Sequence, residues 1–315
     1  MQKRMVKVFA PATIANLGPG FDVLGLAIAK PGDFVTARRI EARELHFKVS
    51  GRIREVPSDT KKNVAAFVAK LMMDEFHPPF GVELTLEKQM PIGSGLGSSA
   101  ASSVAAAVAC NALLAKPLKK QELLRFILEG ERLASGSPHA DNAAPSLFGG
   151  VCLIRSYDPL DIIPIPVKDS MLWVVVHPHV IVETKKARSV LPKSITLRSA
   201  IRQWGNVGGL TYALAEGNME LIGRCIEDGV IEPVRARLIP GFSKVKEAAL
   251  RAGAHGCSIS GSGPSLFAVA GSVREAHAIG RRMKNVFKIH AGISSDVYIS
   301  RVNNEGAKIL WTKAR

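Results

Sequence analysis

Residues 91–101 (PIGSGLGSSAA) have the composition of a loop that binds phosphate. The alternation of apolar and polar residues over 81–87 predicts a strand before the loop, and the Ala- and Val-rich run over 100–114 predicts a buried helix after it. The free N–H groups of such a loop and the N-terminus of its helix converge on one anion. Alternating glycines permit positive φ angles and a close approach of backbone to ligand, and the serines add hydroxyl groups. A branched side chain at Gly95 is therefore expected to block phosphate while leaving the fold intact.

The loop fits neither of the two common nucleotide-binding patterns. It has no Gly-Lys-Ser/Thr ending, which excludes a Walker A loop, and its glycine spacing differs from that of a dinucleotide-binding fold. A different phosphate-binding architecture is expected.

Composition predicts a packed, cytoplasmic enzyme of one large or two ordinary domains. The 315 residues are 47% hydrophobic and 6% aromatic. Four widely separated cysteines without a C-x-x-C pair indicate buried, reduced thiols rather than disulfides or a structural metal. The chain begins directly in a strand pattern, so no signal peptide is expected, and its longest apolar run is too short to cross a membrane.

The net charge of +15 raises the question of nucleic-acid binding. Basic residues are spread along the chain without a tract and without interleaved aromatic residues that could stack on bases. A positive electrostatic field that attracts anionic ATP explains the net charge equally well, so no nucleic-acid partner is expected.

Strand and helix patterns come in clusters rather than in strict βαβ alternation, which predicts an α+β protein with two lobes. One helix is predicted over 64–76, with Asn63 as its N-cap. An amphipathic helix over 273–286 and a last strand over 296–302 are expected to close the chain, and a proline-marked stretch at 158–169 is the best candidate for the boundary between lobes.

The Gly-rich loop resembles the central motif of the GHMP kinases, a family of small-molecule kinases, at every fixed position. Residues 11–25 (PATIANLGPGFDVLG) resemble the N-terminal signature of the branch that phosphorylates L-homoserine, although alone they could be an ordinary Gly/Pro turn capped by Asn16 and Asp22. Residues 258–265 (SISGSGPS) are similar to the family's third motif. The resemblance implies an ATP-binding lobe like ribosomal protein S5 domain 2 over 1–165 and a ferredoxin-like lobe over 166–315.

The resemblance also implies a metal site and the absence of a base. Glu131 matches the family's Mg²⁺ ligand and would act with a loop hydroxyl, for which Ser99 is favoured over Ser98; alone, Glu131 would be a surface carboxylate. Asn142 stands where mevalonate-type members carry a catalytic Asp, and the adjacent Asp141 is expected to point elsewhere. Phosphoryl transfer depends mainly on positioning and charge stabilisation, so a missing base does not exclude catalysis.

The residue types needed to bind the substrate follow from the charges of homoserine. An Arg fork matches a carboxylate, and a carboxylate side chain matches an ammonium group. In the family, residues matching Arg188 and Arg235 bind the carboxylate, Asp22 matches the ammonium partner, and Asn16, His139 and Thr184 match residues around the hydroxyl. Taken singly, each arginine would be a surface residue and His139 a structural one.

The resulting site prediction comprises four sets. The catalytic set is Glu131, Asn142, Thr184 and Arg188. The ATP set is Asn63, Pro91, Ile92, Gly93, Ser94, Gly95, Leu96, Gly97, Ser98, Ser99, Ala100 and Ala101. The substrate set is Asn16, Asp22, His139, Arg188, Arg235, Gly261 and Ser262, and the metal set is Ser99 and Glu131.

The implied activity is ATP- and Mg²⁺-dependent phosphorylation of the side-chain hydroxyl of L-homoserine to O-phospho-L-homoserine, a step of threonine biosynthesis. Family members are often dimers, and the sequence leaves a homodimer open. Two alternatives remain. A kinase of the mevalonate or archaeal shikimate type is disfavoured by Thr13 and Asn142, and a non-catalytic ligand-binding relative is disfavoured by Glu131 and the paired loop serines.

Overall fold

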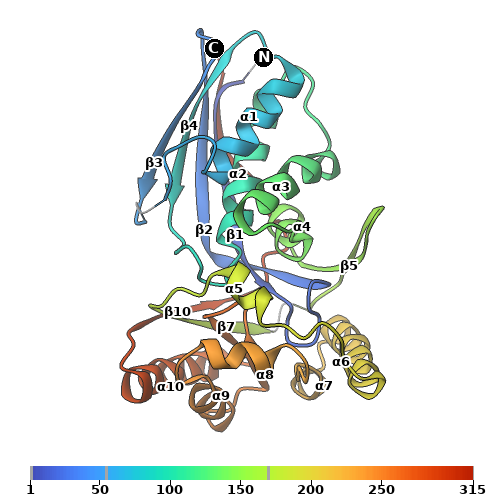
Figure 1. Cartoon of the computed structure of the whole chain (residues 1–315). Helices are drawn as coiled ribbons and strands as arrows, with labels where there is room; N and C mark the ends of the chain where they lie inside the picture. Colours follow the sequence, from blue (N-terminus) through green and yellow to red (C-terminus); the bar gives the residue numbers. More distant parts are fainter. Residues whose placement is uncertain (1–2, 54–55, 169–170, 315) are drawn as a thin grey trace.

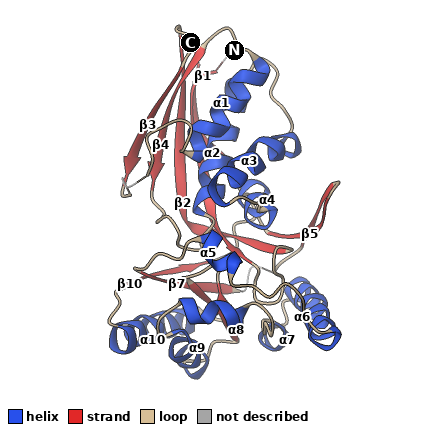
Figure 2. Cartoon of the chain, in the orientation of Figure 1, coloured by secondary structure: helices blue, strands red, loops and turns tan. Residues whose placement is uncertain are grey.

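The chain folds into two lobes stacked one above the other (Figure 1). The computed structural model describes residues 3–53, 56–168 and 171–314. The upper lobe in that view is a mixed sheet with helices packed on one face, and the lower lobe is an antiparallel sheet with helices below it (Figure 2). This arrangement is the predicted two-lobed α+β class.

The sheet of the first lobe has seven strands in the order β11-β1-β2-β4-β3, with β5 paired to β2 and β6 paired to β5. Only the β3–β4 pair is parallel among the strand pairs of the described chain. The strands are β1 (Lys3–Ala15), β2 (Leu24–Ile40), β3 (Leu45–Gly51), β4 (Gly81–Lys88), β5 (Val151–Tyr157), β6 (Leu160–Ile165) and β11 (Lys308–Ala314).

Four helices cover this sheet: α1 (Val64–Phe76), α2 (Ser98–Leu113), α3 (Lys120–Ser135) and α4 (Ala140–Phe148). Helix α2 is buried along nearly its whole length, because its small Ala, Ser and Val side chains let it lie between the sheet and the neighbouring helices α1 and α3. A buried helix that begins at the Gly-rich loop holds that loop rigidly against the core.

The structure confirms some predicted boundaries and corrects others. Helix α1 spans the predicted residues, and the Asn63 side chain accepts hydrogen bonds from the N–H groups of Ala65 and Ala66. Helix α2 begins at Ser98, two residues earlier than predicted. The strand predicted over 296–302 is present as β10 (Ser295–Ser300), but it does not close the chain, because β11 follows it and pairs with β1. All β11 side chains are exposed, so its sequence lacks the alternation that reveals a half-buried strand.

The second lobe is built on a four-stranded antiparallel sheet in the order β10-β7-β9-β8. Its strands are β7 (Leu172–Pro178), β8 (Gly256–Ile259), β9 (Leu266–Ala270) and β10 (Ser295–Ser300). Its helices are α5 (Thr184–Ser189), α6 (Leu197–Glu216), α7 (Met219–Cys225), α8 (Glu232–Arg235), the 3₁₀ turn η1 (Ala236–Leu238), α9 (Phe242–Arg251) and α10 (Val273–Ala291). Helices α9 and α10 pack on the sheet to form a separate core.

The division of the chain into lobes at residue 165 stays a prediction. The path of the backbone shows where the end of the chain lies relative to these lobes. After β10 the chain leaves the second lobe, and β11 pairs with β1 in the sheet of the first, so the first and last strands of the described chain both lie in the first lobe. The four cysteines are buried and unpaired, as expected. None of the helices in the described ranges is long and apolar enough to cross a membrane.

A buried ion pair sits beneath the Gly-rich loop. The Asp33 carboxylate contacts the Lys88 ammonium group and accepts hydrogen bonds from the N–H groups of Gln89 (2.9 Å) and Met90 (3.2 Å). The Lys88 ammonium group also donates to the Ser98 carbonyl (2.8 Å), and the Ser102 hydroxyl donates to Asp33 (2.9 Å). Because both charges are fully paired, this cluster can be buried, and it fixes the end of β4 relative to the start of α2.

Candidate active site

The Gly-rich loop connects β4 to α2 and forms one wall of a cleft of about 430 Å³ between the lobes. Gly93, Gly95 and Gly97 all have left-handed φ angles, between 63° and 75°. The loop is held from the second lobe by two serine hydroxyls: Ser260 donates to the Gly95 carbonyl and Ser265 to the Ser94 carbonyl, each at 2.6 Å. These two hydrogen bonds tie the backbone of the loop to the second lobe.

The glycines of the loop are required by protein packing, not only by a ligand. A Cβ atom on Gly95 would lie 2.4 Å from the Ser260 carbonyl oxygen, and one on Gly97 would lie 2.0 Å from the Thr13 hydroxyl. The expectation that a side chain at Gly95 would leave the fold intact is therefore wrong, because it would push the two lobes apart.

Most of the predicted site residues line this single cleft. They come from distant segments of both lobes and are Asn16, Asp22, Asn63, Ile92, Gly93, Ser94, Gly95, Gly97, Ser98, Ser99, Glu131, His139, Asn142, Thr184, Arg188, Arg235, Gly261 and Ser262. Pro91, Leu96, Ala100 and Ala101 do not line it. Leu96 and the two alanines are buried in the core, where they support the loop from behind.

Glu131 is a buried carboxylate. Judged from its position in the sequence alone, it would be a solvent-exposed surface residue. Its side chain is on α3 and the residue is 2% exposed. One carboxylate oxygen, Oε1, is buried without a hydrogen-bond partner among the described residues, and Oε2 lies 3.7 Å from His139 Nδ1. An unpaired buried oxygen is costly unless a ligand satisfies it, so the geometry fits a bound cation.

The two loop serines differ in what their hydroxyls can reach. The Ser98 hydroxyl donates to the Met90 carbonyl at 3.4 Å, within its own loop. No such bond within the described chain engages Ser99, which lines the cleft at the start of α2. This difference supports Ser99 as the hydroxyl available to a ligand.

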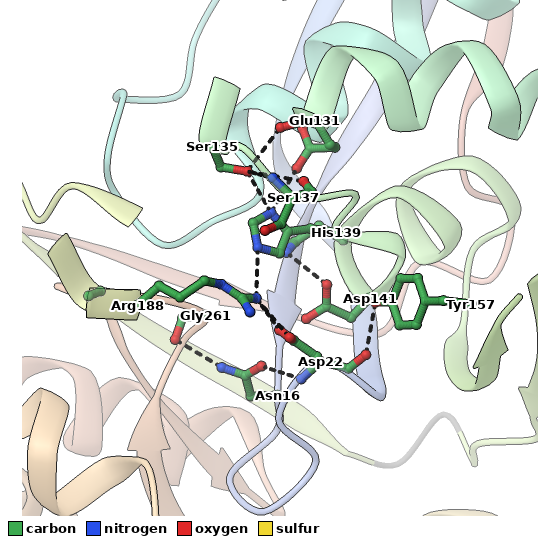
Figure 3. A network of polar contacts seen from close by, with 12 residues as sticks. Asn16, Asp22, Glu131, Ser135, Ser137, His139, Asp141, Tyr157, Arg188 and Gly261 are labelled. Carbon is green, nitrogen blue, oxygen red and sulfur yellow. Dashed lines mark hydrogen bonds and ion pairs between the residues drawn. The ribbon is translucent and has the colours of Figure 1, made fainter. Parts of the chain in front are cut away.

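His139 connects the Glu131 corner to the arginine corner of the cleft (Figure 3). Its Nδ1 lies 3.0 Å from the Ser135 hydroxyl, and its Nε2 lies 3.2 Å from Arg188 Nη2. Since a guanidinium can only donate, the neutral ring accepts at Nε2 and carries its proton on Nδ1. Burial opposes a second proton, but the carboxylates of Glu131, Asp141 and Asp22 outweigh burial and raise the pKa of His139.

Asp22 and Arg188 form an ion pair at the other end of the cleft. Arg188 Nη2 lies 2.9 Å and 2.7 Å from the two Asp22 carboxylate oxygens (Figure 3). Asp22 has a left-handed φ of 60°, which an L-residue adopts only when its surroundings hold it. The Asn16 side chain accepts from the Asp22 N–H, and the Tyr157 hydroxyl donates to the Asp22 carbonyl at 2.9 Å.

The second arginine is buried beside the first. Arg235 is 3% exposed, with Nε donating to the Ala187 carbonyl and Nη1 to the Gly261 carbonyl. Burial lowers the pKa of Arg235 to about 10, and the nearby Arg188 cation acts in the same direction. Arg235 nevertheless remains a cation at neutral pH and carries a positive charge at the cleft wall.

Sequence reasoning missed three residues of this site. The centroid of the Phe21 ring lies 5.3 Å from the guanidinium carbon of Arg188 and 5.0 Å from that of Arg235. One aromatic ring therefore makes cation–π contacts with two arginines. Tyr157 approaches from the β5–β6 hairpin. Only the position of Phe21, next to Asp22 in the N-terminal signature, could have drawn attention to it.

Asp141 is the third, and the expectation that it points elsewhere is wrong. Its side chain lines the cleft although the residue is nearly inaccessible to solvent. Burial raises the pKa of Asp141 to about 7, with His139 opposing that shift. Its neighbour Asn142 lines the cleft as predicted, and its amide oxygen accepts a hydrogen bond of 2.7 Å from Thr13.

Comparison with known proteins identifies the family to which this chain belongs. The models for the GHMP kinases N terminal domain and the GHMP kinases C terminal domain match residues 63–150 and 210–289. The homoserine kinase of Chlorobium phaeovibrioides is 47% identical, over 98% of this chain and 100% of that one. The chain belongs to the GHMP kinase family, in its homoserine kinase branch.

Solved structures of GHMP kinases agree with this assignment. The homoserine kinase of Cytophaga hutchinsonii superimposes with a TM-score of 0.93 and 49% identity, over 98% of both chains. The mevalonate kinase of L. major, at 17% identity and a TM-score of 0.75 over 97% of this chain and 99% of that one, shares the fold alone. This GHMP kinase therefore has the two-lobed fold that its motifs predicted.

The packing of Gly95 leads to a prediction about the loop. Gly95→Ala should lower the free energy of unfolding and weaken ATP binding at least about tenfold, because the new Cβ would overlap the Ser260 carbonyl. Urea unfolding and calorimetric titration with ATP measure the two effects. The matched control is Gly292→Ala, which has a similar φ of +68° but nothing within 4 Å among the described atoms, and should cost only about 1–2 kcal/mol. Equal losses in both variants would show that the contact with Ser260 is unimportant.

Proposed function

We propose that this GHMP kinase transfers the γ-phosphoryl group of ATP to the side-chain hydroxyl of L-homoserine, giving O-phospho-L-homoserine for threonine biosynthesis. The observation that carries the proposal is the juxtaposition, in one cleft, of a phosphate-binding loop with the Asp22–Arg188 pair and Arg235. The relative from Chlorobium phaeovibrioides and the solved structure from Cytophaga hutchinsonii are both homoserine kinases, which supports the same assignment.

The Asp22–Arg188 pair suits a zwitterion. Both side chains are partly exposed, so their mutual attraction is screened and exchange with a ligand costs little. A substrate carboxylate would take the place of Asp22 on Arg188, and its ammonium group would take the place of Arg188 on Asp22. Only a ligand with both charges compensates both residues, whereas mevalonate compensates one and a sugar neither.

The hydroxyl end of the substrate would lie between the arginines and the loop. Asn16, His139 and Thr184 line this part of the cleft, and the Thr184 hydroxyl lies 3.4 Å from that of Ser262. Asn142 cannot act as a base, because an amide has no useful pKa. We infer that catalysis depends on alignment of the hydroxyl with the phosphoryl group and on stabilisation of charge by N–H groups and cations.

Glu131 and Ser99 would hold a Mg²⁺ ion. The unpartnered Oε1 atom of Glu131 supports this assignment. When bound, Mg²⁺ supplies positive charge to the phosphate oxygens. His139 Nδ1 lies 3.7 Å from Glu131 Oε2 and 3.0 Å from the Ser135 hydroxyl, so the ring would act on Glu131 through its charge and not through a direct hydrogen bond.

A direct test of the proposed function is an ADP-release assay over a panel of acceptors. L-Homoserine should support turnover, while mevalonate, shikimate and galactose should give rates near that without acceptor. Preference for mevalonate or shikimate would assign another GHMP activity, and ATP binding without turnover on any acceptor would favour a non-catalytic relative.

Glu131→Gln should lower kcat about a hundredfold or more, since removal of one charge-stabilising group typically costs about 3 kcal/mol of transition-state stabilisation. The measurement is kcat as a function of Mg²⁺ concentration. Glu129→Gln is the control, because Glu129 is exposed on the same helix and forms an ion pair with the exposed Arg132. Activity of Glu131→Gln within a few-fold of wild type at saturating Mg²⁺ would rule out the metal role.

Arg188→Lys should raise the KM for homoserine at least about tenfold and change that for ATP little, because an ammonium group cannot replace the guanidinium fork. Steady-state kinetics with each substrate varied in turn gives both values. Arg155→Lys serves as the control, since Arg155 is exposed and contacts Asp161 in the hairpin. A similar change in both KM values, or in neither, would refute the homoserine site as assigned.

A further inference from the structure

Strand β7 is buried along its whole length, and His177 is its one ionisable side chain. Successive side chains of a strand point to opposite faces of the sheet. Val174 and Val176 pack in the core formed with α9 and α10, whereas Trp173 and Val175 belong to the core that continues into the first lobe. This alternation places His177, which is 3% exposed, on the face that is directed towards the first lobe and its Gly-rich loop.

The strand register brings His177 next to Ser265. Strands β7 and β9 are antiparallel and pair Val176 with Leu266, so the next position along sets His177 opposite Ser265. The His177 Nδ1 atom lies 3.1 Å from the Ser265 hydroxyl oxygen, and that hydroxyl donates to the Ser94 carbonyl at 2.6 Å. Because a hydroxyl has only one proton to donate, the Ser265 oxygen accepts from His177, whose proton is therefore on Nδ1.

The His177 ring is neutral at physiological pH. Burial lowers the pKa of His177 to about 4, the neighbouring His179 acts in the same direction, and Asp296 on β10 acts against them. A neutral imidazole has a single N–H group, which the contact with Ser265 uses. Burial of a polar ring costs stability relative to an apolar side chain of similar size, so core packing alone does not explain a histidine here.

The hydrogen-bond chain from His177 through Ser265 ends on Ser94, a residue of the Gly-rich loop. The Ser94 carbonyl also accepts from the Ser265 N–H group at 3.3 Å, so two groups of one residue hold it. The hydroxyl of Ser94 is itself buried without a hydrogen-bond partner among the described residues, and Ser94 lines the cleft. An unpaired buried hydroxyl at the cleft wall is available to a phosphate oxygen, and the backbone contact sets the position from which it projects.

We infer that His177 is a positioning residue for the phosphate loop, which acts through Ser265 to hold Ser94 with its hydroxyl directed at the triphosphate. This inference rests on the proposed binding of ATP in the cleft. His177 does not line the cleft, so it would influence the nucleotide only through the loop. The Asp22–Arg188 pair takes no part in the hydrogen-bond chain, so homoserine binding should not depend on His177.

A pair of substitutions with nearly the same shape tests the N–H group of His177. His177→Leu should raise the Kd of ATP at least about fivefold, the worth of one hydrogen bond, and leave the KM for homoserine unchanged. His177→Asn should bind ATP almost as the wild type does, because the asparagine amide can place an N–H group where Nδ1 lies. Calorimetric titration with ATP and steady-state kinetics give the two values. Val175→Ala is the control, since it removes buried volume from the same face of β7 and should lower Tm without changing ATP affinity.

Two further measurements test the path through Ser265. Ser265→Ala should weaken ATP binding at least as much as His177→Leu, and the double variant should be no weaker than Ser265→Ala alone. Nitrogen NMR of the wild-type imidazole needs no variant and should show the neutral Nδ1–H tautomer at pH 7.

Three results would overturn the inference: equal ATP affinity of the Leu and Asn variants, additive losses in the double variant, or an Nε2–H tautomer. A wild type that does not bind ATP at all would overturn the proposed function itself, and the inference with it.

Discussion

The structure depends on a close backbone contact between the Gly-rich loop and the third-motif loop of the second lobe. Two serine hydroxyls, Ser260 and Ser265, donate to carbonyls of the loop, and Gly95 lies too close to the Ser260 carbonyl to carry a side chain. The Gly261 carbonyl in turn accepts hydrogen bonds from Asn16 and Arg235, which brings these two side chains to the same point. Backbone groups cannot move independently of their segments, so this contact sets the distance between the phosphate loop and the substrate residues.

The contact between the two loops also brings oppositely charged side chains together around the cleft. Lys88 is neutralised by Asp33 beneath the loop, Arg188 by Asp22 at the substrate end, and Arg235 keeps its charge at the wall. The acidic side of the cleft holds Glu131, Asp141 and Asp22, which together raise the pKa of His139. Acidic and basic side chains therefore lie side by side where Asp22 contacts Arg188, and His139 links this pair to Glu131.

The N-terminal signature loop shows how strain and polar contacts act together. Asn16, Leu17 and Asp22 all have left-handed φ angles, which are uncommon outside glycine. The Asn16 side chain and the Tyr157 hydroxyl satisfy the backbone of Asp22 on both sides, and Phe21 lies against both arginines. Contacts from both lobes therefore hold this loop in an uncommon backbone conformation and fix the position of Asp22 beside Arg188.

The local chemistry of this protein was determined by its sequence. Helix α1 with its Asn63 cap and the Gly-rich loop between a strand and a helix follow from residue type and spacing, since each depends on neighbours within a few positions. Tertiary structure alone decided five other features: the burial of Glu131, the direction of Asp141 into the cleft, the Asp22–Arg188 ion pair, the contact of Phe21 with both arginines, and the pairing of β11 with the first sheet. Each of these depends on contact between segments more than about a hundred residues apart or on desolvation by the whole fold, and neither quantity is encoded in local periodicity.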